Sequence, residues 1–150
     1  MQVGDLKAVY VIEQQSFPLP WSLESFRNEL ENNQFARYFC LMSDGQVVGY
    51  MGLWEILNEG HVTNLAVSPE YRCRGYGEFL IGSVMRIISD KGIKRMTLEV
   101  RVSNLTARKL YERLGFVAVG VRKGYYNDNH EDALIMWAEL DINQSLEVNI

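Results

Sequence analysis

The sequence has few of the residues that form cross-links or metal sites: 2 cysteines and 2 histidines in 150 residues. Cys40 and Cys73 lie far apart without a paired spacing, and His61 and His130 do not cluster with them. These absences argue against a disulfide framework and against a zinc-type ligand set, so we predict no metal. A reducing cytoplasm is the expected compartment.

Long apolar runs and an excess of basic charge are also missing. The longest apolar runs, such as residues 133–138, are far too short to span a bilayer, and the N-terminus shows no signal peptide. The formal net charge of −4 argues against broad nucleic-acid binding. We therefore expect no membrane and no direct nucleic-acid partner. The composition is 47% hydrophobic and 23% charged, which is typical of one globular domain over residues 1–150, with residues 141–150 as a flexible tail.

The N-terminal part predicts two helices. The first runs from an Asp5 cap to Gln15, with its apolar face spaced as in an amphipathic helix. After a Pro-containing break, Ser22 is a good N-cap, and Trp21 and Phe26 have the spacing of a hydrophobic staple.

The rest of the chain predicts a mixed α/β sheet. Strands at 38–42 and 46–56 flank an Asp44-Gly45 hairpin turn, and residues 61–67 form the next strand. A helix ending at Gly92 and a strand at 94–100 follow, then a helix capped by Asn104 and strands at 116–123 and 133–140. A strand–helix–strand order predicts that the central strand pair is parallel. The broad apolar face of the first of these helices is Phe79, Leu80, Ile81, Val84, Met85, Ile87 and Ile88, and the apolar face of the following strand is Met96, Leu98 and Val100.

The loop before the first of these helices concentrates arginine and glycine in an otherwise acidic chain. Arg72, Arg74, Gly75 and Gly77 lie between the C-terminal end of a strand and the N-terminus of a helix. Helix N-termini and glycine-rich backbone offer free N–H groups to anions, and arginine adds charge-assisted hydrogen bonds. The alternative is a surface loop with solvated arginines. The dinucleotide fingerprint fails because Leu80 replaces its third glycine, and the P-loop pattern is absent.

The segment "NLAVSPEYRCRGYG" resembles the acetyl-CoA motif of the GNAT N-acetyltransferases, with Arg72-x-x-Gly75-x-Gly77 at its centre. Segments 16–26, 97–116 and 121–137 resemble the RimI-like ribosomal-protein-alanine N-acetyltransferases, so the resemblance extends to about Leu140. It implies the GNAT acyl-CoA N-acyltransferase fold, which is a mostly antiparallel sheet with a splayed central parallel strand pair and flanking helices.

The resemblance implies acetyl-CoA as co-substrate, with its pyrophosphate on the Arg/Gly loop and its pantetheine arm on the backbone of the preceding strand. One N–H of that strand is the expected oxyanion donor. Cys73 departs from the basic residue often found in this loop, which places one phosphate contact in doubt. The implied cofactor residues are Leu65, Ala66, Val67, Arg72, Cys73, Arg74, Gly75, Tyr76, Gly77, Glu78 and Asn104.

The resemblance also assigns the acid–base residues of a direct attack by an amine on the thioester. Glu99 is the expected general base, with a pKa raised by partial burial; the alternative is an exposed glutamate paired with Arg101. Tyr111 is the expected general acid, acting on the thiolate; the alternative is a buried core tyrosine.

Acceptor recognition is expected around the last turn and beside the N-terminal helices. Glu131 and Asp132 would attract a cationic peptide N-terminus; the aromatic residues named for an acceptor groove are Phe17, Trp21, Trp54, Tyr125 and Tyr126. Alternatively, these aromatic rings belong to the core and the turn is merely solvated.

The resemblance implies a cytoplasmic enzyme that acetylates the N-terminal alanine of a small-subunit ribosomal protein. An α-amino group has a pKa of about 7.7–8.0 and a lysine about 10.4, so deprotonating an N-terminus at neutral pH costs about 3 kcal/mol less. The oligomeric state is open, with a monomer expected. Two other functions stay open: acetylation of another N-terminus or of a small amine, and a non-catalytic acyl-CoA-binding regulator.

Overall fold

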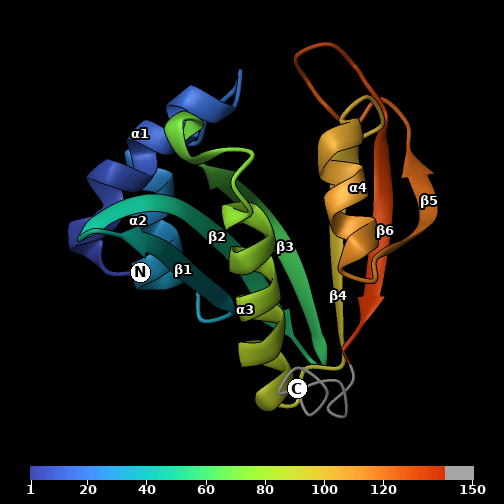
Figure 1. The fold of residues 1–150 in the computed structure, drawn as a ribbon, viewed down its shortest axis with the longest axis horizontal. Helices are drawn as coiled ribbons and strands as arrows, with labels where there is room; N and C mark the ends of the chain where they lie inside the picture. The colour runs from blue at the N-terminus through green and yellow to red at the C-terminus, as the bar shows by residue number, and fades with distance from the viewer. Residues whose placement is uncertain (141–150) are drawn as a thin grey trace. The chain divides into compact units, whose positions relative to one another are not determined.

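A computed structural model describes residues 1–140, so the expected tail at 141–150 lies outside the described residues. Figure 1 shows the order of helices and strands along the chain. The elements are η1 Val3–Asp5, α1 Leu6–Ser16, α2 Leu23–Asn32, β1 Ala36–Ser43, β2 Gln46–Ile56, β3 Glu59–Val67, η2 Pro69–Tyr71, α3 Tyr76–Asp90, β4 Arg95–Arg101, α4 Leu105–Arg113, β5 Val117–Arg122 and β6 Ala133–Glu139.

The strands form one six-stranded sheet in the order β1-β2-β3-β4-β6-β5. The pairs β1–β2, β4–β6 and β5–β6 are antiparallel, whereas β3 and β4 are parallel. The parallel pairing joins Glu59–His61 to Arg95–Thr97, so β3 begins two residues earlier than predicted. The predicted mixed sheet with a central parallel pair is confirmed.

The chain forms two compact units, which we describe separately. The N-terminal unit comprises Met1–Glu55 and Thr63–Ile81, and the C-terminal unit comprises Ile56–Val62 and the residues from Gly82 on. Strand β3 and helix α3 contribute to both. A single domain over the whole chain stays a prediction.

In the N-terminal unit, the predicted helix caps and the hairpin turn are largely correct. The Ser22 hydroxyl accepts the Ser25 N–H at 3.0 Å, and the rings of Trp21 and Phe26 lie 5.4 Å apart, as a staple requires. The exception is Asp5: its carboxylate accepts the Gln2 N–H at 2.7 Å, because the 3₁₀ turn η1 precedes α1. The buried cluster of this unit is Leu6, Val9, Ile12, Phe26, Tyr38, Tyr50 and Ala66.

One carboxylate lies within that apolar region. Glu13 is 2% exposed, and its two oxygens accept hydrogen bonds from the Tyr50 hydroxyl and from the Trp21 N–H. Burial raises the pKa of Glu13, and the hydrogen bond from Trp21 opposes that rise. Glu13 thus ties α1 to β2 and to the segment before α2.

In the C-terminal unit, β4 alternates as predicted, with Met96, Leu98 and Val100 buried. Thr97, on the opposite face, is buried as well, and its hydroxyl donates to the Met136 carbonyl at 3.1 Å.

The expected apolar face of α3 was too broad. Leu80, Ile81, Val84 and Ile88 are buried, but Phe79 is 65% exposed and Ile87 is 41% exposed. The helix therefore buries a narrower stripe than the sequence predicts. No helix within residues 1–140 is long and apolar enough to cross a membrane.

Candidate active site

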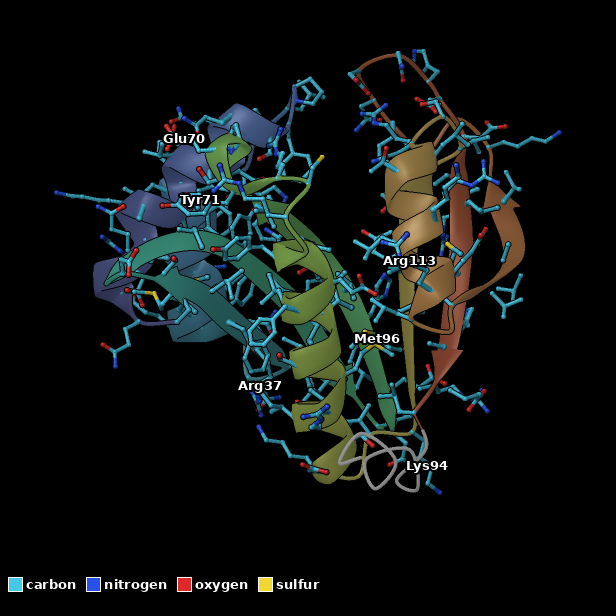
Figure 2. All side chains as sticks on the ribbon, viewed as in Figure 1. Arg37, Glu70, Tyr71, Lys94, Met96 and Arg113 are labelled. Carbon is cyan, nitrogen blue, oxygen red and sulfur yellow. The ribbon has the colours of Figure 1, made fainter. Side chains whose placement is uncertain are left out.

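The Arg/Gly loop of the N-terminal unit connects the end of β3 to the start of α3, as predicted. Figure 2 labels Glu70 and Tyr71 on η2, the short turn that opens this loop. Cys73 has φ 61° and Gly75 has φ 82°, both in the left-handed region, and α3 begins at Tyr76. No atom lies within 4 Å of a Cβ placed on Gly75, so a side chain would fit there. Glycine is favoured at this position because of its left-handed φ.

This backbone leaves donors available for an anion. Within residues 1–140 the N–H groups of Cys73, Arg74 and Gly75 make no backbone hydrogen bond, and those of Tyr76 and Gly77 belong to the first helical turn. First-turn N–H groups have no intrahelical acceptor, and alternating left-handed residues turn successive N–H groups inward. The loop therefore suits a phosphate group.

The arginines of the loop have different surroundings. Arg72 Nε donates to the Val67 carbonyl and Arg72 Nη2 to the Ser16 hydroxyl, each at 2.9 Å. Its guanidinium thus holds the loop against β3 and α1, which the sequence did not indicate. Arg74 lies 5.9 Å from the Tyr71 ring centroid and is exposed. Of the two, Arg74 is the better placed to contact an anion.

The last residues of β3 lie directly before the loop. Ala66 is buried, and Leu65 and Val67 are half-buried. A Cβ on Gly49 would lie 3.1 Å from the Ala66 carbonyl, so the backbone of β2 approaches this part of β3 closely. Pairing of these residues with a pantetheine arm stays a prediction.

In the C-terminal unit, the Glu99 carboxylate is engaged at both oxygens. Oε2 lies 3.0 Å from His61 Nε2, and Oε1 lies 3.3 Å from Arg122 Nε. The Glu99 side chain is 8% exposed, whereas that of His61 is 40% exposed. The Glu99 carboxylate is therefore buried beneath the partly exposed side chains of His61 and Arg122.

These partners contradict the expected rise of the Glu99 pKa and the alternative pairing of Glu99 with Arg101. The pKa of Glu99 is lowered, not raised, because the hydrogen bond from His61 outweighs the opposing effect of burial, and Arg122 adds to the lowering. Glu99 also does not pair with Arg101, which has other partners described below. Sequence reasoning missed both His61 and Arg122, since neither lies near Glu99 in the chain.

Tyr111 and Asn104 belong to the helix that follows β4. Tyr111 is 9% exposed, and burial raises the pKa of its phenol to about 12. Within residues 1–140 the Tyr111 hydroxyl has no hydrogen-bond partner, so its proton is free for another group. The Asn104 side chain accepts the Ala107 N–H at 3.1 Å, which confirms the predicted cap. The roles of both residues toward acetyl-CoA stay predictions.

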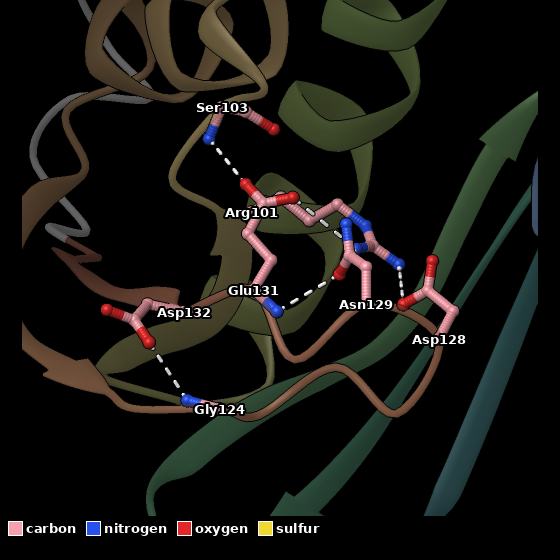
Figure 3. Close-up of polar contacts among 7 residues, drawn as sticks. All are labelled: Arg101, Ser103, Gly124, Asp128, Asn129, Glu131 and Asp132. Carbon is pink, nitrogen blue, oxygen red and sulfur yellow. Dashed lines mark hydrogen bonds and ion pairs between the residues drawn. The ribbon is translucent and has the colours of Figure 1, made fainter.

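The turn between β5 and β6 is held by Arg101 (Figure 3). The Arg101 guanidinium contacts Asp128 at 2.8 Å and Glu131 at 3.4 Å. It also lies 3.9 Å from the Tyr126 ring centroid. Glu131 also accepts the Ser103 N–H at 2.8 Å. Arg101 therefore joins the end of β4 to the turn that carries the predicted acceptor residues.

The predicted acceptor carboxylates are consequently part of this turn's own structure. Besides the contacts of Glu131, Asp132 accepts the Gly124 N–H at 2.9 Å. Tyr125 is 47% exposed and pairs edge-on with Tyr126 at 5.1 Å. Tyr125 is thus available to a ligand, whereas attraction of a peptide by Glu131 and Asp132 stays a prediction.

The aromatic residues expected near the N-terminal helices lie in the N-terminal unit. Phe17 and Trp21 pack against its buried cluster, and the Trp54 indole N–H donates to Glu29 at 2.8 Å. Their membership of an acceptor groove stays a prediction. No group of three metal-binding side chains is present among residues 1–140.

The mixed sheet with its parallel β3–β4 pair and the Arg/Gly loop between β3 and α3 agree with the acyl-CoA-dependent acyltransferase class that the sequence resembles. The chain belongs to the acetyltransferase (GNAT) family, which matches residues 6–116.

Three relatives illustrate the likeness. A Bacillus subtilis protein, provisionally named as a ribosomal protein bS18-alanine N-acetyltransferase, is 43% identical over 141 residues, covering 94% of this chain and 93% of its own. The ribosomal protein bS18-alanine N-acetyltransferase of Haemophilus influenzae is 37% identical over 141 residues, covering 91% and 93%. The crystal structure of the ribosomal-protein-S18-alanine N-acetyltransferase from Escherichia coli superposes with a TM-score of 0.87 at 33% identity, covering 95% and 92%.

Proposed function

We propose that this chain transfers the acetyl group of acetyl-CoA to the α-amino group of the N-terminal alanine of ribosomal protein bS18. The observation that carries the proposal is its likeness, over nearly the whole chain, to proteins that bear this activity in their names. The partners of the enzyme are then the bS18 N-terminus and coenzyme A, and its place of action is the cytoplasm. We expect the enzyme to act as a monomer.

Acetyl-CoA supplies an acyl carbon that is activated as a thioester. The N–H groups of residues 73–77 and the Arg74 guanidinium bind its pyrophosphate, and the Asn104 side chain adds a contact. The backbone of Leu65–Val67 pairs with its pantetheine arm and supplies one N–H to the developing oxyanion. Open donors and the left-handed Cys73 and Gly75 support this assignment.

Glu99 and Tyr111 carry the acid–base chemistry in this proposal. Glu99 serves the removal of a proton from the acceptor ammonium, and Tyr111 protonates the leaving thiolate. The free hydroxyl of Tyr111 supports its role, since a phenol that already donates to a protein group would be a poorer acid. Removing a general acid or base typically lowers the rate by about 10²–10⁴-fold.

A thiol-release assay with acetyl-CoA and a peptide that begins with the bS18 N-terminal alanine tests the function. The controls are the same peptide with a blocked N-terminus and a panel of polyamines. We expect turnover with the free peptide alone, and mass spectrometry should place one acetyl group on its α-nitrogen. Turnover with polyamines but not with the peptide would replace this function with small-amine acetylation.

Substitutions of the two proposed acid–base residues test the roles within that assay. Glu99→Gln and Tyr111→Phe are each expected to lower kcat by about 10²–10⁴-fold while the affinity for coenzyme A stays unchanged. If both variants turned over like the wild type, the chain would still be an acetyltransferase, but these two roles would be wrong.

A further inference from the structure

The hydrogen bond between His61 and Glu99 joins two residues that are 38 positions apart in the sequence. The parallel register places His61 opposite Thr97, and Glu99 follows two residues later on the same face of β4. Both side chains belong to the C-terminal unit, so their contact is a property of that unit alone. The fold therefore builds a histidine–carboxylate pair at the residue proposed to serve deprotonation.

Glu99 is poorly suited to keep a proton taken from an α-ammonium. Its pKa is lowered by the hydrogen bond from His61 and by the charge of Arg122. An α-ammonium has an ordinary pKa of about 7.7–8.0, so proton transfer from it to a carboxylate with a lowered pKa is unfavourable. Efficient general bases have pKa values near the working pH, and imidazole is the side chain whose ordinary value, about 6.5, lies there.

The imidazole of His61 is oriented for that task. Its Nε2 faces the Glu99 carboxylate, and within residues 1–140 its Nδ1 has no partner. When Nε2 carries the hydrogen and donates it to Glu99, the Nδ1 lone pair is free to accept a proton. The 40% exposure of the side chain leaves it open to water and to an acceptor.

We propose that His61 receives the proton that the acceptor α-ammonium loses, and that Glu99 positions His61 and stabilises its imidazolium. This inference rests on the proposed function. One N–H bond of the ammonium breaks, its proton goes to His61 Nδ1, and the freed electron pair forms the bond to the acetyl carbon. The carbon–sulfur bond then breaks with its electron pair on sulfur.

Tyr111, His61 and water account for the other proton transfers. Tyr111 gives its proton to the thiolate, and the second proton released by the nitrogen restores the phenol. His61 passes its proton to water. The net change is one proton released to solvent for each amide formed, as the conversion of an ammonium and a thioester into an amide and a thiol requires.

The other charged and titratable groups around the pair come from β5 and the turn after it. Arg122 contacts the Glu99 oxygen that His61 does not use, and the hydroxyls of Tyr125 and Tyr126 interact electrostatically with Glu99. Arg122 lowers the pKa of Glu99 and so keeps its carboxylate ionised. Glu99 therefore has to supply the compensating negative charge when His61 is protonated.

The dependence of activity on pH distinguishes a base from a structural residue. We expect His61→Gln to lower kcat/KM for the peptide about 100-fold or more at pH 7, because glutamine can still donate to Glu99 but cannot accept the proton. The deficit should shrink to within about tenfold at pH 9.5, where water alone deprotonates the α-amine. Glu59→Gln, on the same strand with its carboxylate 4.0 Å from Arg95, is the matched control and should follow the wild type throughout.

A deficit of less than tenfold at pH 7, or one that is the same at both pH values, would overturn the role of His61. Absence of turnover in the wild type would instead overturn the proposed function. The affinity for coenzyme A, measured by calorimetry, should be unchanged in His61→Gln.

A spectroscopic measurement on the wild type does not depend on the stability of a variant. The chain has 2 histidines, so nitrogen-15 NMR resolves their tautomers, with His130→Asn to assign the signals. Neutral His61 should be protonated at Nε2, and Glu99→Gln should weaken this preference. Protonation of Nδ1 in the neutral wild type would leave no lone pair there and would refute the proposal.

Discussion

Gly52 of β2 lies where a side chain cannot fit, and Gly52→Ala should therefore destabilise the N-terminal unit strongly. A Cβ at this position would lie 2.5 Å from Asn64 Oδ1 and still closer to Cε1 of the Tyr38 ring. The ring cannot easily give way, because Tyr38 is 7% exposed and its hydroxyl contacts Glu29 at 3.4 Å and Thr63 at 3.3 Å.

The expected cost follows from those contacts. Overpacking a filled site costs about 1–3 kcal/mol, and displacing the ring adds about 1 kcal/mol for a lost hydrogen bond. The reduced entropy of the unfolded chain returns about 0.4–1 kcal/mol. We expect a net loss of about 2–3 kcal/mol, which lowers the Tm of a chain of this size by roughly 5–10 °C.

Gly82→Ala is the matched control, because it makes the same chemical change at an open position. Gly82 lies inside α3, and the nearest atom to its added Cβ would be Leu114 Cδ2 at 3.9 Å. Alanine there should stabilise by about 0.5–1 kcal/mol. Thermal and urea denaturation followed by circular dichroism measure both variants. A Tm of Gly52→Ala within 2 °C of the wild type would refute the packing argument.

Three further outcomes can be checked. In Gly75→Ala the alanine has to adopt a left-handed φ, which costs about 1–2 kcal/mol. Calorimetry should therefore show that this variant binds coenzyme A about 5- to 30-fold more weakly. Gly45→Ala introduces the same strain in a hairpin turn and should not affect binding. Because burial raises the pKa of Glu13 in the folded state, its stabilising effect is greatest below its ordinary pKa and is lost as the pH rises through the folded value. In urea denaturation, the free energy of unfolding of Glu13→Gln should therefore rise relative to that of the wild type between pH 5 and pH 8. A difference between the two proteins that is the same at both pH values would contradict this. Arg101→Met should raise the KM for the peptide roughly tenfold, which is the effect of losing one charge-assisted hydrogen bond, and should leave the affinity for coenzyme A unchanged. An equal loss of affinity for both ligands would mean that Arg101 stabilises the whole C-terminal unit and not the turn alone.

The sequence predicted the features whose causes are local. Ser22 and Asn104 cap helices because their side chains reach N–H groups three residues ahead, a distance that the chain itself fixes. Gly92 has φ 95° and follows a helix, where a left-handed residue favours glycine. The position of the Arg/Gly loop belongs to this group, since the sequence pattern itself indicates a strand, a loop and a helix in that order.

The features that sequence reasoning missed depend on long-range pairing. His61 reaches Glu99 because of the register between β3 and β4, and Arg122 reaches it through β5. No periodicity within one segment encodes such a register. Glu13 shows the same limit, because its burial depends on donors from Trp21 and Tyr50, which the sequence of α1 does not indicate.

The hydrogen bonds of Arg72 also depend on acceptors that are not adjacent to it in the sequence. Its guanidinium hydrogen-bonds to Val67 and Ser16 and so holds the loop in place, while contact of Arg72 with a phosphate stays a prediction. An arginine near an anion site can serve the backbone instead of the ligand, and only the positions of its acceptors distinguish the two roles.

The separation of Glu99 from Arg101 has a chemical consequence. Both lie on one face of β4, and a simple pairing would neutralise them. Instead Arg101 binds the acidic turn at Asp128 and Glu131, which leaves Glu99 to His61 and Arg122. A carboxylate that is buried, ionised and hydrogen-bonded to an imidazole is a stabiliser of positive charge, because its own protonation would break both contacts. On β4, Arg101 therefore stabilises the turn and Glu99 orients His61. The proton of the amine is then best received by His61 and not by the Glu99 carboxylate.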